Sequence, residues 1–336
     1  MIATNPSRLP ALAQFLLLAA LSLTSCSGGE EQTQASAPLS SVGKPSLPQI
    51  TPAKGFPAKV KNSDGRVALL EKQPQRVIAG NASLLDGLIT LIGPERVAAL
   101  PSTAFSYSTL AANPGVWADV PLLKHFDAEE LLAPRPDLII AHNYQAGSTI
   151  DRLVERDVPV VLFPIPATWK DTIAHIECLA RLLGEEERAT EMLADLETRR
   201  RALQNKSARS GLRVLPYGNY GAGGTTAGAG TTWQVMIELA GMRNAAAEAG
   251  IDRHPDIDFE QLLSIDPDFF LISKSEGQSG SGAEEILRNE PLLAGLRAIR
   301  ENRILILPEY LYSCASQELL TAAEHLAEQA DANLAE

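Results

Sequence analysis

A short segment that occurs twice constrains this chain more than any other feature. Residues 127–140 read DAEELLAPRPDLII and residues 258–271 read DFEQLLSIDPDFFL. Both follow the pattern D-x-E-x-L-L-x-x-x-P-D and continue into an apolar run. The spacing between the copies is far longer than the roughly 20 to 50 residues of a solenoid repeat. The repeat therefore predicts two lobes of similar architecture, and a cleft between two lobes is where ligands usually bind.

Each copy also predicts a local structure. Asp127 and Asp258 are expected to cap short helices, and Glu130 and Gln261, three residues later, complete the pattern of a capping box. The apolar runs that follow have no alternation of apolar and polar residues, which is typical of strands buried in a parallel sheet.

Glu129 and Glu260 are the repeated residues that this local motif does not use. A carboxylate in the first turn of a helix is favourable in its own right, so either glutamate alone needs no further explanation. Because both occupy the same register of the repeat, we favour a functional role for the pair.

The N-terminus has the pattern of an export signal. Arg8 precedes an apolar stretch that ends near Leu23, and its length fits a signal peptide better than a spanning helix. The sequence Leu-Thr-Ser-Cys that ends at Cys26 resembles a bacterial lipobox, so we expect lipidation at Cys26; an ordinary signal peptide with an incidental cysteine is the alternative. We expect residues 1–25 to be the signal peptide and residues 26–57 to be a disordered tether. The protein is then an exported lipoprotein of the cell envelope.

The two remaining cysteines, Cys178 and Cys314, leave two interpretations open. An oxidising compartment permits a disulfide between them, and two separate buried thiols fit the sequence equally well. The net charge of −12, from 41 acidic and 29 basic residues, argues against binding to nucleic acid.

The body of the chain alternates predicted strands and helices, which indicates α/β lobes with mostly parallel sheets. We expect an N-terminal lobe over residues 58–168 and a C-terminal lobe over residues 209–336. A helical pattern over residues 169–208, which Gly184 can break, is expected to connect them.

Motifs for catalysis or for metal binding are absent. The Gly/Thr-rich segment 219–232 lacks the spacing of a dinucleotide or phosphate loop, so we interpret it as a loop over the cleft. The sequence has no H-E-x-x-H, G-x-S-x-G or C-x-x-C pattern, and its five histidines lack metal-ligand spacing. We therefore predict a binding protein without a cofactor or a metal site of its own, and not an enzyme.

Polar and aromatic residues follow the carboxyl ends of the predicted strands, where open parallel sheets bind their ligands. These candidate cleft residues are Asn81, Ser83, Tyr107, His125, Tyr144, Tyr217, Tyr220, Trp233, Tyr310 and Tyr312. Aromatic rings with a polar group suit a bulky, partly apolar ligand, although we expect about half of the tyrosines only to pack at lobe edges.

Several of these features together resemble one known family. They are the lipobox, the P-x-R-V-I sequence from Pro74 to Ile78, the two E-x6-P-D segments, the long connector, and A-G-x-x-N from Ala240 to Asn244. Over about residues 65–330 the chain resembles the periplasmic binding proteins for ferric siderophores, haem and cobalamin, which deliver substrates to ABC importers. The resemblance implies two Rossmann-like lobes bridged by one long helix, a monomeric state, and docking of Glu129 and Glu260 onto arginines of the permease.

The resemblance does not fix the ligand. The first loop reads Gly-Asn-Ala-Ser at residues 80–83, where relatives commonly have Ser-Pro-Ser, so the ligand contact there is open. Lys124 and Lys274 are the cations near the predicted cleft, and no cluster of arginines accompanies them. This pattern favours a neutral or bulky chelate, a ferric siderophore or cobalamin, over a multiply charged one.

Other interpretations stay open at this stage. Haem ranks behind the other chelates and would need an axial ligand such as Tyr107, His125 or Tyr217. A chelatase-like enzyme on the same fold and a lipoprotein that only contacts partner proteins are the remaining alternatives.

Overall fold

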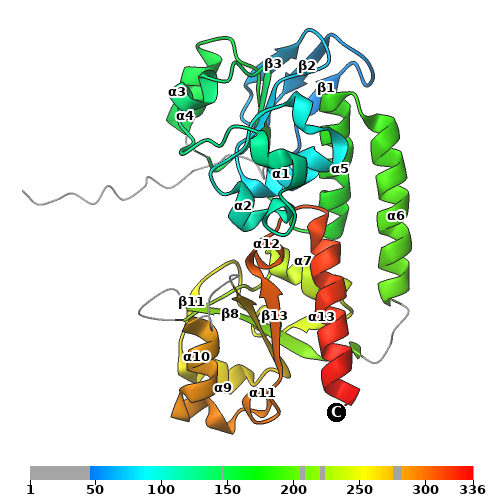
Figure 1. Cartoon of the computed structure of the whole chain (residues 1–336). Coiled ribbons are helices and arrows are strands. Elements are labelled where there is room, and N and C mark those ends of the chain that lie inside the picture. The colour runs from blue at the N-terminus through cyan, green and yellow to red at the C-terminus, as the bar shows by residue number, and fades with distance from the viewer. Residues whose placement is uncertain (1–45, 146, 205–208, 220–223, 275–281, 336) are drawn as a thin grey trace, which may run out of the picture. The chain divides into compact units, whose positions relative to one another are not determined.

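The computed structural model describes residues 46–145, 147–204, 209–219, 224–274 and 282–335. Residues from Val42 onward form one compact unit, whose helices and strands are drawn in Figure 1. The predictions for a signal peptide, for lipidation at Cys26 and for ligand binding by Tyr220 lie outside the described residues. Among the described residues, no helix is both long and apolar enough to cross a membrane.

Four parallel strands form the sheet of the N-terminal lobe, in the order β5-β4-β6-β7. Their bounds are β4 Val77–Ala79, β5 Val97–Ala99, β6 Leu138–His142 and β7 Val160–Phe163. Every residue of these strands is buried, which explains their unbroken apolar runs.

Helices cover both faces of this sheet, and side chains of successive strand residues point to opposite faces. The covering helices are α1 Ala82–Leu91, α3 Ala128–Leu132, α4 Gly147–Val154 and α5 Trp169–Leu183. Ile140 packs in one core with α1 and α5, whereas Ile139 packs in a second core with α3 and α4. The α/β architecture with a parallel sheet is therefore confirmed for this lobe.

The sheet of the C-terminal lobe follows the order β11-β9-β8-β12-β13, and β10 also pairs with β8. Its parallel strands are β8 Arg213–Asn219, β10 Arg243–Asn244, β12 Phe269–Lys274 and β13 Ile304–Pro308. The antiparallel strands are β9 Gly224–Thr226 and β11 Asp256–Ile257, which extend the sheet beyond β8 on one side. The segment predicted as a loop over residues 219–232 thus contains a strand, because β9 folds back on β8.

Helices also cover both faces of this second sheet. They are α7 Thr232–Leu239 and α13 Glu318–Ala335 on one face, and α8 Ala245–Glu248, α9 Phe259–Ile265, α10 Gly282–Asn289 and α11 Arg297–Arg300 on the other. The boundaries expected for the two lobes stay predictions, because the described chain is one compact unit.

Two helices, rather than one, occupy the predicted connector. Helix α5 ends at Gly184, whose φ of 69° is left-handed and favours glycine, and α6 spans Glu186–Gln204. Helix α6 lies beside α13 in Figure 1, and Arg199 of α6 forms an ion pair of 2.6 Å with Glu324 of α13.

The expectation of a disordered tether over residues 26–57 is wrong for its last part. Strands β1 Gln49–Thr51, β2 Ala58–Lys61 and β3 Val67–Leu70 form an antiparallel sheet. Ile50 and Phe56 pack on the main core. Arg181 of α5 donates hydrogen bonds to the main-chain oxygens of Pro52 and Gly55, so this segment is held by both apolar and polar contacts.

The two copies of the repeated segment differ in their caps. Asp258 and Gln261 form the predicted capping box at α9. Asp127 caps α3 as expected, but Glu130 accepts hydrogen bonds from the amides of Lys124 and His125, so no capping box forms there. Both Cys178 and Cys314 are free thiols, which excludes the disulfide interpretation for this structure.

Candidate functional site

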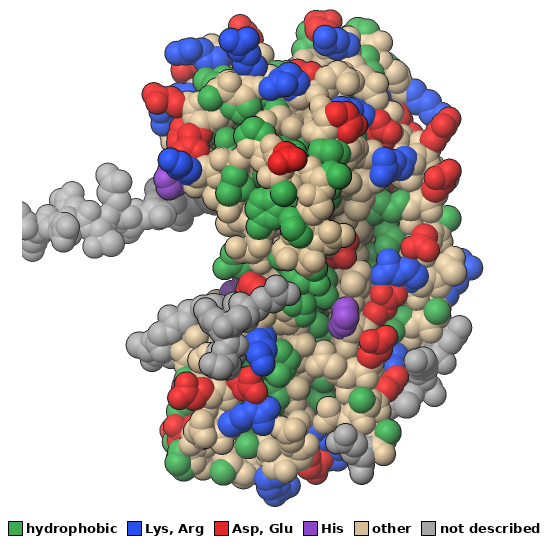
Figure 2. Space-filling model, in the orientation of Figure 1, with side chains coloured by type: hydrophobic (Ala, Val, Ile, Leu, Met, Phe, Trp, Pro, Cys, Tyr) green, Lys and Arg blue, Asp and Glu red, His purple; other side chains and the backbone are tan. Residues whose placement is uncertain are grey.

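A pocket of ≈ 280 Å3 lies between the two lobes. One wall comes from α2 (Ala104–Tyr107) and the other from the end of β13 and the start of α12 (Glu309–Tyr312). The structure thereby brings together two predicted binding residues, Tyr107 and Tyr310. Figure 2 shows the hollow on this face of the molecule, with hydrophobic side chains along its upper wall.

Tyr144 is an exposed aromatic surface at the carboxyl end of β6. Its ring is 64 % exposed and stacks on the ring of His142, with centroids 5.3 Å apart and planes inclined by 18°. His142 is 2 % exposed, and its Nδ1 lies 3.1 Å from the main-chain oxygen of Phe163. Burial lowers the pKa of His142 to about 4, so a neutral imidazole supports Tyr144 at physiological pH.

Asn81 and Gln145 hold this region in place. The Oδ1 atom of Asn81 caps α1 by accepting from Leu84 N, and its Nδ2 donates to the hydroxyl of Tyr144 at 3.3 Å. Gln145 donates to the main-chain oxygen of Gly80 and accepts from the amide of His142. A Cβ atom at Gly80 would lie 2.7 Å from Gln145 Oε1, so a larger residue in the first loop would displace the Gln145 side chain.

Trp233 is the centre of an aromatic cluster in the C-terminal lobe. Its ring meets those of His254 and Tyr312 edge-on, with centroids 5.1 and 5.3 Å away. Trp233 is partly buried and Tyr312 is 5 % exposed, so little of these two residues is open to a ligand.

The structure separates the remaining candidates. Tyr217 is 1 % exposed and packs edge-on against Phe270, so its side chain is part of the core of the C-terminal lobe. His125 is exposed on the loop before α3. Ser83 lines a second, smaller cavity below the first turn of α1.

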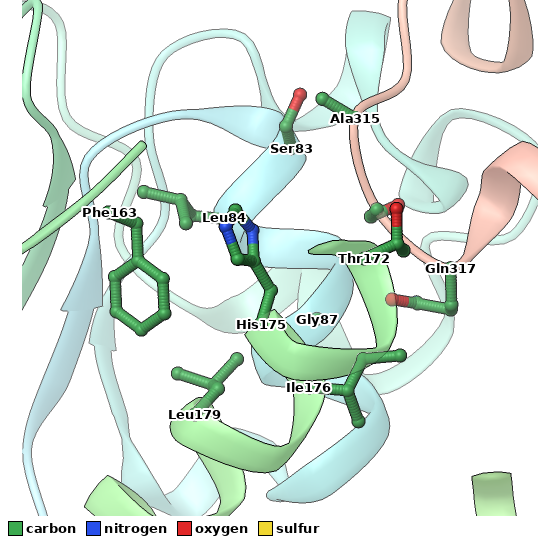
Figure 3. A pocket seen from close by; sticks show the side chains of 11 residues that line it. Ser83, Leu84, Gly87, Phe163, Thr172, His175, Ile176, Leu179, Ala315 and Gln317 are labelled. Carbon is green, nitrogen blue, oxygen red and sulfur yellow. The ribbon is translucent and has the colours of Figure 1, made fainter. Parts of the chain in front are cut away.

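This second cavity lies where α1, α5 and the segment 315–317 meet (Figure 3). His175 points into it, as Figure 3 shows, with Thr172 and Gln317 beside it. Its volume of ≈ 30 Å3 is room for one or two waters, not for a chelate. The larger pocket and Tyr144 are therefore the better candidates for ligand contact. Within the described residues, no group of three or more His, Cys, Asp or Glu side chains could hold a metal ion.

Residues 95–311 match the profile of the family described as periplasmic binding protein. The chain belongs to the periplasmic binding protein family.

Two curated relatives and one solved structure are similar to this chain. A cobalamin-binding protein of Halobacterium salinarum is 23% identical over 237 residues, which cover 70% of this chain and 63% of the relative. The Fe(3+)-citrate-binding protein YfmC of Bacillus subtilis is 21% identical over 312 residues and 90% of each chain. The structure of the periplasmic heme-binding protein BhuT with two hemes superposes with a TM-score of 0.67 and 24% identity, over 77% of this chain and 98% of that one. This chain thus spans less than two thirds of the cobalamin-binding relative, and the likeness to BhuT shows the two-lobed fold alone.

In this periplasmic binding protein the repeated glutamates lie on corresponding helices of the two lobes. Glu129 is exposed on α3 and Glu260 is exposed on α9. Neither carboxylate forms an ion pair or accepts a hydrogen bond within the described part of the chain, in contrast to the neighbouring Glu130.

Sequence reasoning did not assign Gln145 or Glu309 to the site, and it placed His142 only at a position that could face the cleft. Gln145 and His142 position Tyr144 through contacts that close only in the folded chain. Glu309 lies in the larger pocket, and its place directly after a predicted strand could have identified it.

Proposed function

We propose that this protein captures a metal chelate between its lobes and delivers it to the permease of an ABC importer. The observation that carries the proposal is the exposed ring of Tyr144, which His142 and Asn81 fix at the carboxyl end of β6. A separate pocket between the lobes supports it. An oriented aromatic face suits a large ligand with both apolar and polar surface. The named ligands of the relatives, cobalamin, ferric citrate and heme, support a metal chelate for this chain as well.

We rank a ferric siderophore and cobalamin equally, with haem behind them. Haem would need an axial ligand, for which the sequence offers Tyr107, His125 and Tyr217. Tyr217 is buried in the core, whereas Tyr107 is 41 % exposed beside the pocket and is the best placed of the three. A chelatase-like enzyme on this fold is the alternative, and measurable turnover of a chelate would favour it.

We also propose that Glu129 and Glu260 dock onto cations of the permease. Two exposed, unpaired carboxylates at equivalent places on two lobes can orient the protein on a partner that has two similar basic sites. Lipidation at Cys26 would hold the exported protein beside that permease at a membrane surface.

Uptake by cells tests this proposal. Cells that lack the protein are expected to lose uptake of one labelled chelate and to regain it when the gene is restored. Unchanged uptake of ferric siderophores, cobalamin and haem in cells that lack the protein would contradict the transport function.

A further inference from the structure

Glu309 places a carboxylate in the lining of the interlobe pocket. This pocket, called the Glu309 pocket below, is lined by the side chains of Tyr107, Glu309 and Tyr310 together with smaller groups. Glu309 is the charged residue of its lining, and it is partly buried. A volume of ≈ 280 Å3 lies just below the range of about 300–1,000 Å3 for small-molecule sites, so the pocket fits one arm of a chelate rather than a whole one.

The carboxylate of Glu309 is only partly satisfied by the protein. Its Oε1 accepts a hydrogen bond of 2.6 Å from the hydroxyl of Ser313, one turn later in α12. No ion pair to Glu309 forms among the described residues. Burying a carboxylate is costly unless it is paired, so a partly buried and unpaired carboxylate favours a cationic group beside it.

Lys274 is the cation that the fold brings nearest along the sheet. It pairs with Pro308 in the register of β12 and β13, directly before Glu309. The side chain of Lys274 is nevertheless exposed and does not line the pocket. The position is thus left for a cation that comes with the ligand.

Two neighbouring tyrosines strengthen this interpretation. Aromatic faces attract ammonium groups within about 6 Å of the ring centroid. Tyr107 and Tyr310 line the same pocket from opposite lobes, so a cationic arm seated there would contact both lobes at once.

We propose that the Glu309 pocket binds a protonated amine carried by the chelate, and that Glu309 selects amine-bearing chelates over neutral analogues. The inference rests on the proposed function and goes beyond it by naming the class of substrate. The carboxylate contributes a charge-assisted hydrogen bond, which is stronger than the neutral one that a glutamine can offer.

Two ferric trihydroxamates provide a matched pair of probes. Ferrioxamine B carries a free primary amine, whereas the cyclic ferrioxamine E has the same iron-binding groups and no amine. Calorimetric titration of the purified protein is expected to show tighter binding of ferrioxamine B. The variant Glu309→Gln is expected to raise the dissociation constant of ferrioxamine B by about tenfold and to change that of ferrioxamine E by less than about twofold. Glu328→Gln, an exposed position on α13, is the matched control.

Each result decides the matter. Equal binding of both probes by the native protein, which needs no variant, would overturn the proposal. Equal weakening of both by Glu309→Gln would do the same, because it indicates a structural role. If the protein binds cyanocobalamin, hemin or ferric citrate but neither ferrioxamine, amine selection fails and the receptor function stands. If it binds none of these chelates, both proposals fail together.

Discussion

Gln317 donates a hydrogen bond of 2.9 Å from its Nε2 atom to the main-chain oxygen of Asp86, across 231 positions of the sequence. Gln317 is 4% exposed and Asp86 is fully buried. The contact fastens α1 of the N-terminal lobe to the segment that leads into α13. Asp86 also accepts hydrogen bonds on Oδ1 from the amide and the hydroxyl of Thr109. Asp86 Oδ2 and Gln317 Oε1 are buried without partners in the described part of the chain.

Replacing Asp86 by asparagine is expected to stabilise the protein at neutral pH. Burial raises the pKa of Asp86 from 3.8 to about 8, so the folded protein keeps a proton there that the unfolded chain releases. Between these two pKa values the free energy of unfolding therefore falls as pH rises, by about 1.4 kcal/mol per pH unit. Asparagine keeps the Oδ1 acceptor and removes the titration. Denaturant unfolding from pH 5 to 8 measures how the free energy of unfolding depends on pH in the native protein and in Asp86→Asn. The same pH dependence in both proteins would contradict a raised pKa at Asp86.

Acidification is expected to destabilise the protein through His142, which is buried, and His175, which is partly buried. Burial lowers the pKa of His142 and of His175 to about 4. The unfolded chain takes up protons below about pH 6.5, while the folded protein does not until about pH 4. Stability is therefore lost as pH falls through this window, by about 1.4 kcal/mol per pH unit for each imidazole.

The variant His175→Gln isolates one of these two contributions. It is expected to remove nearly all of the net acid slope, because Asp86 acts in the opposite sense and offsets the imidazole that remains, while the native protein is most stable near pH 6.5. Thermal unfolding across pH 4 to 8 checks both statements. An unchanged acid slope in the variant would show that His175 does not titrate as described.

Tyr144 is expected to contribute to ligand affinity and little to stability. Its side chain is 64 % exposed, so Tyr144→Ala removes few internal contacts. Loss of an aromatic contact should raise the dissociation constant of the bound chelate by about tenfold. Tyr144→Phe keeps the ring that stacks on His142 and should bind within about threefold of the native protein. Equal affinities for the alanine variant and the native protein would remove Tyr144 from the site.

Reversing the charge of both repeated glutamates should separate docking from binding. Glu129→Arg with Glu260→Arg is expected to abolish most uptake, because like charges would then face the permease, and to leave the ligand dissociation constant unchanged. The matched control reverses two other exposed glutamates, Glu191 on α6 and Glu328 on α13. Normal uptake by the first double variant, or equal loss in the control, would refute the docking role.

The alternation of buried strands and helices could be predicted from the sequence, because apolar runs, caps and terminating residues act locally. The repeated segment predicted α3 and α9 and the buried strands that follow them. Gly184 marked the break between α5 and α6, since a left-handed residue ends a helix.

The contacts that assemble the site could not be predicted in the same way. Tyr217 lies near the carboxyl end of β8, close to where site residues are expected, yet its ring packs in the core, because the register of β8 decides which face it takes. The support of Tyr144 by His142, and the ordering of Phe56 against the core, depend on chain segments far apart in sequence. The use of Glu130 outside a capping box depends on the path of the preceding loop.

Tryptophan fluorescence of the purified protein, titrated with ferric hydroxamates, cyanocobalamin and hemin and corrected for absorption by these ligands, tests the central claim most directly. Trp233 packs against Tyr312 of α12, the short helix that begins at Glu309, so a chelate bound between the lobes should quench its emission. The account predicts saturable quenching by one chelate, with a dissociation constant that is micromolar or lower. A flat response to every chelate, confirmed by calorimetry, would contradict it.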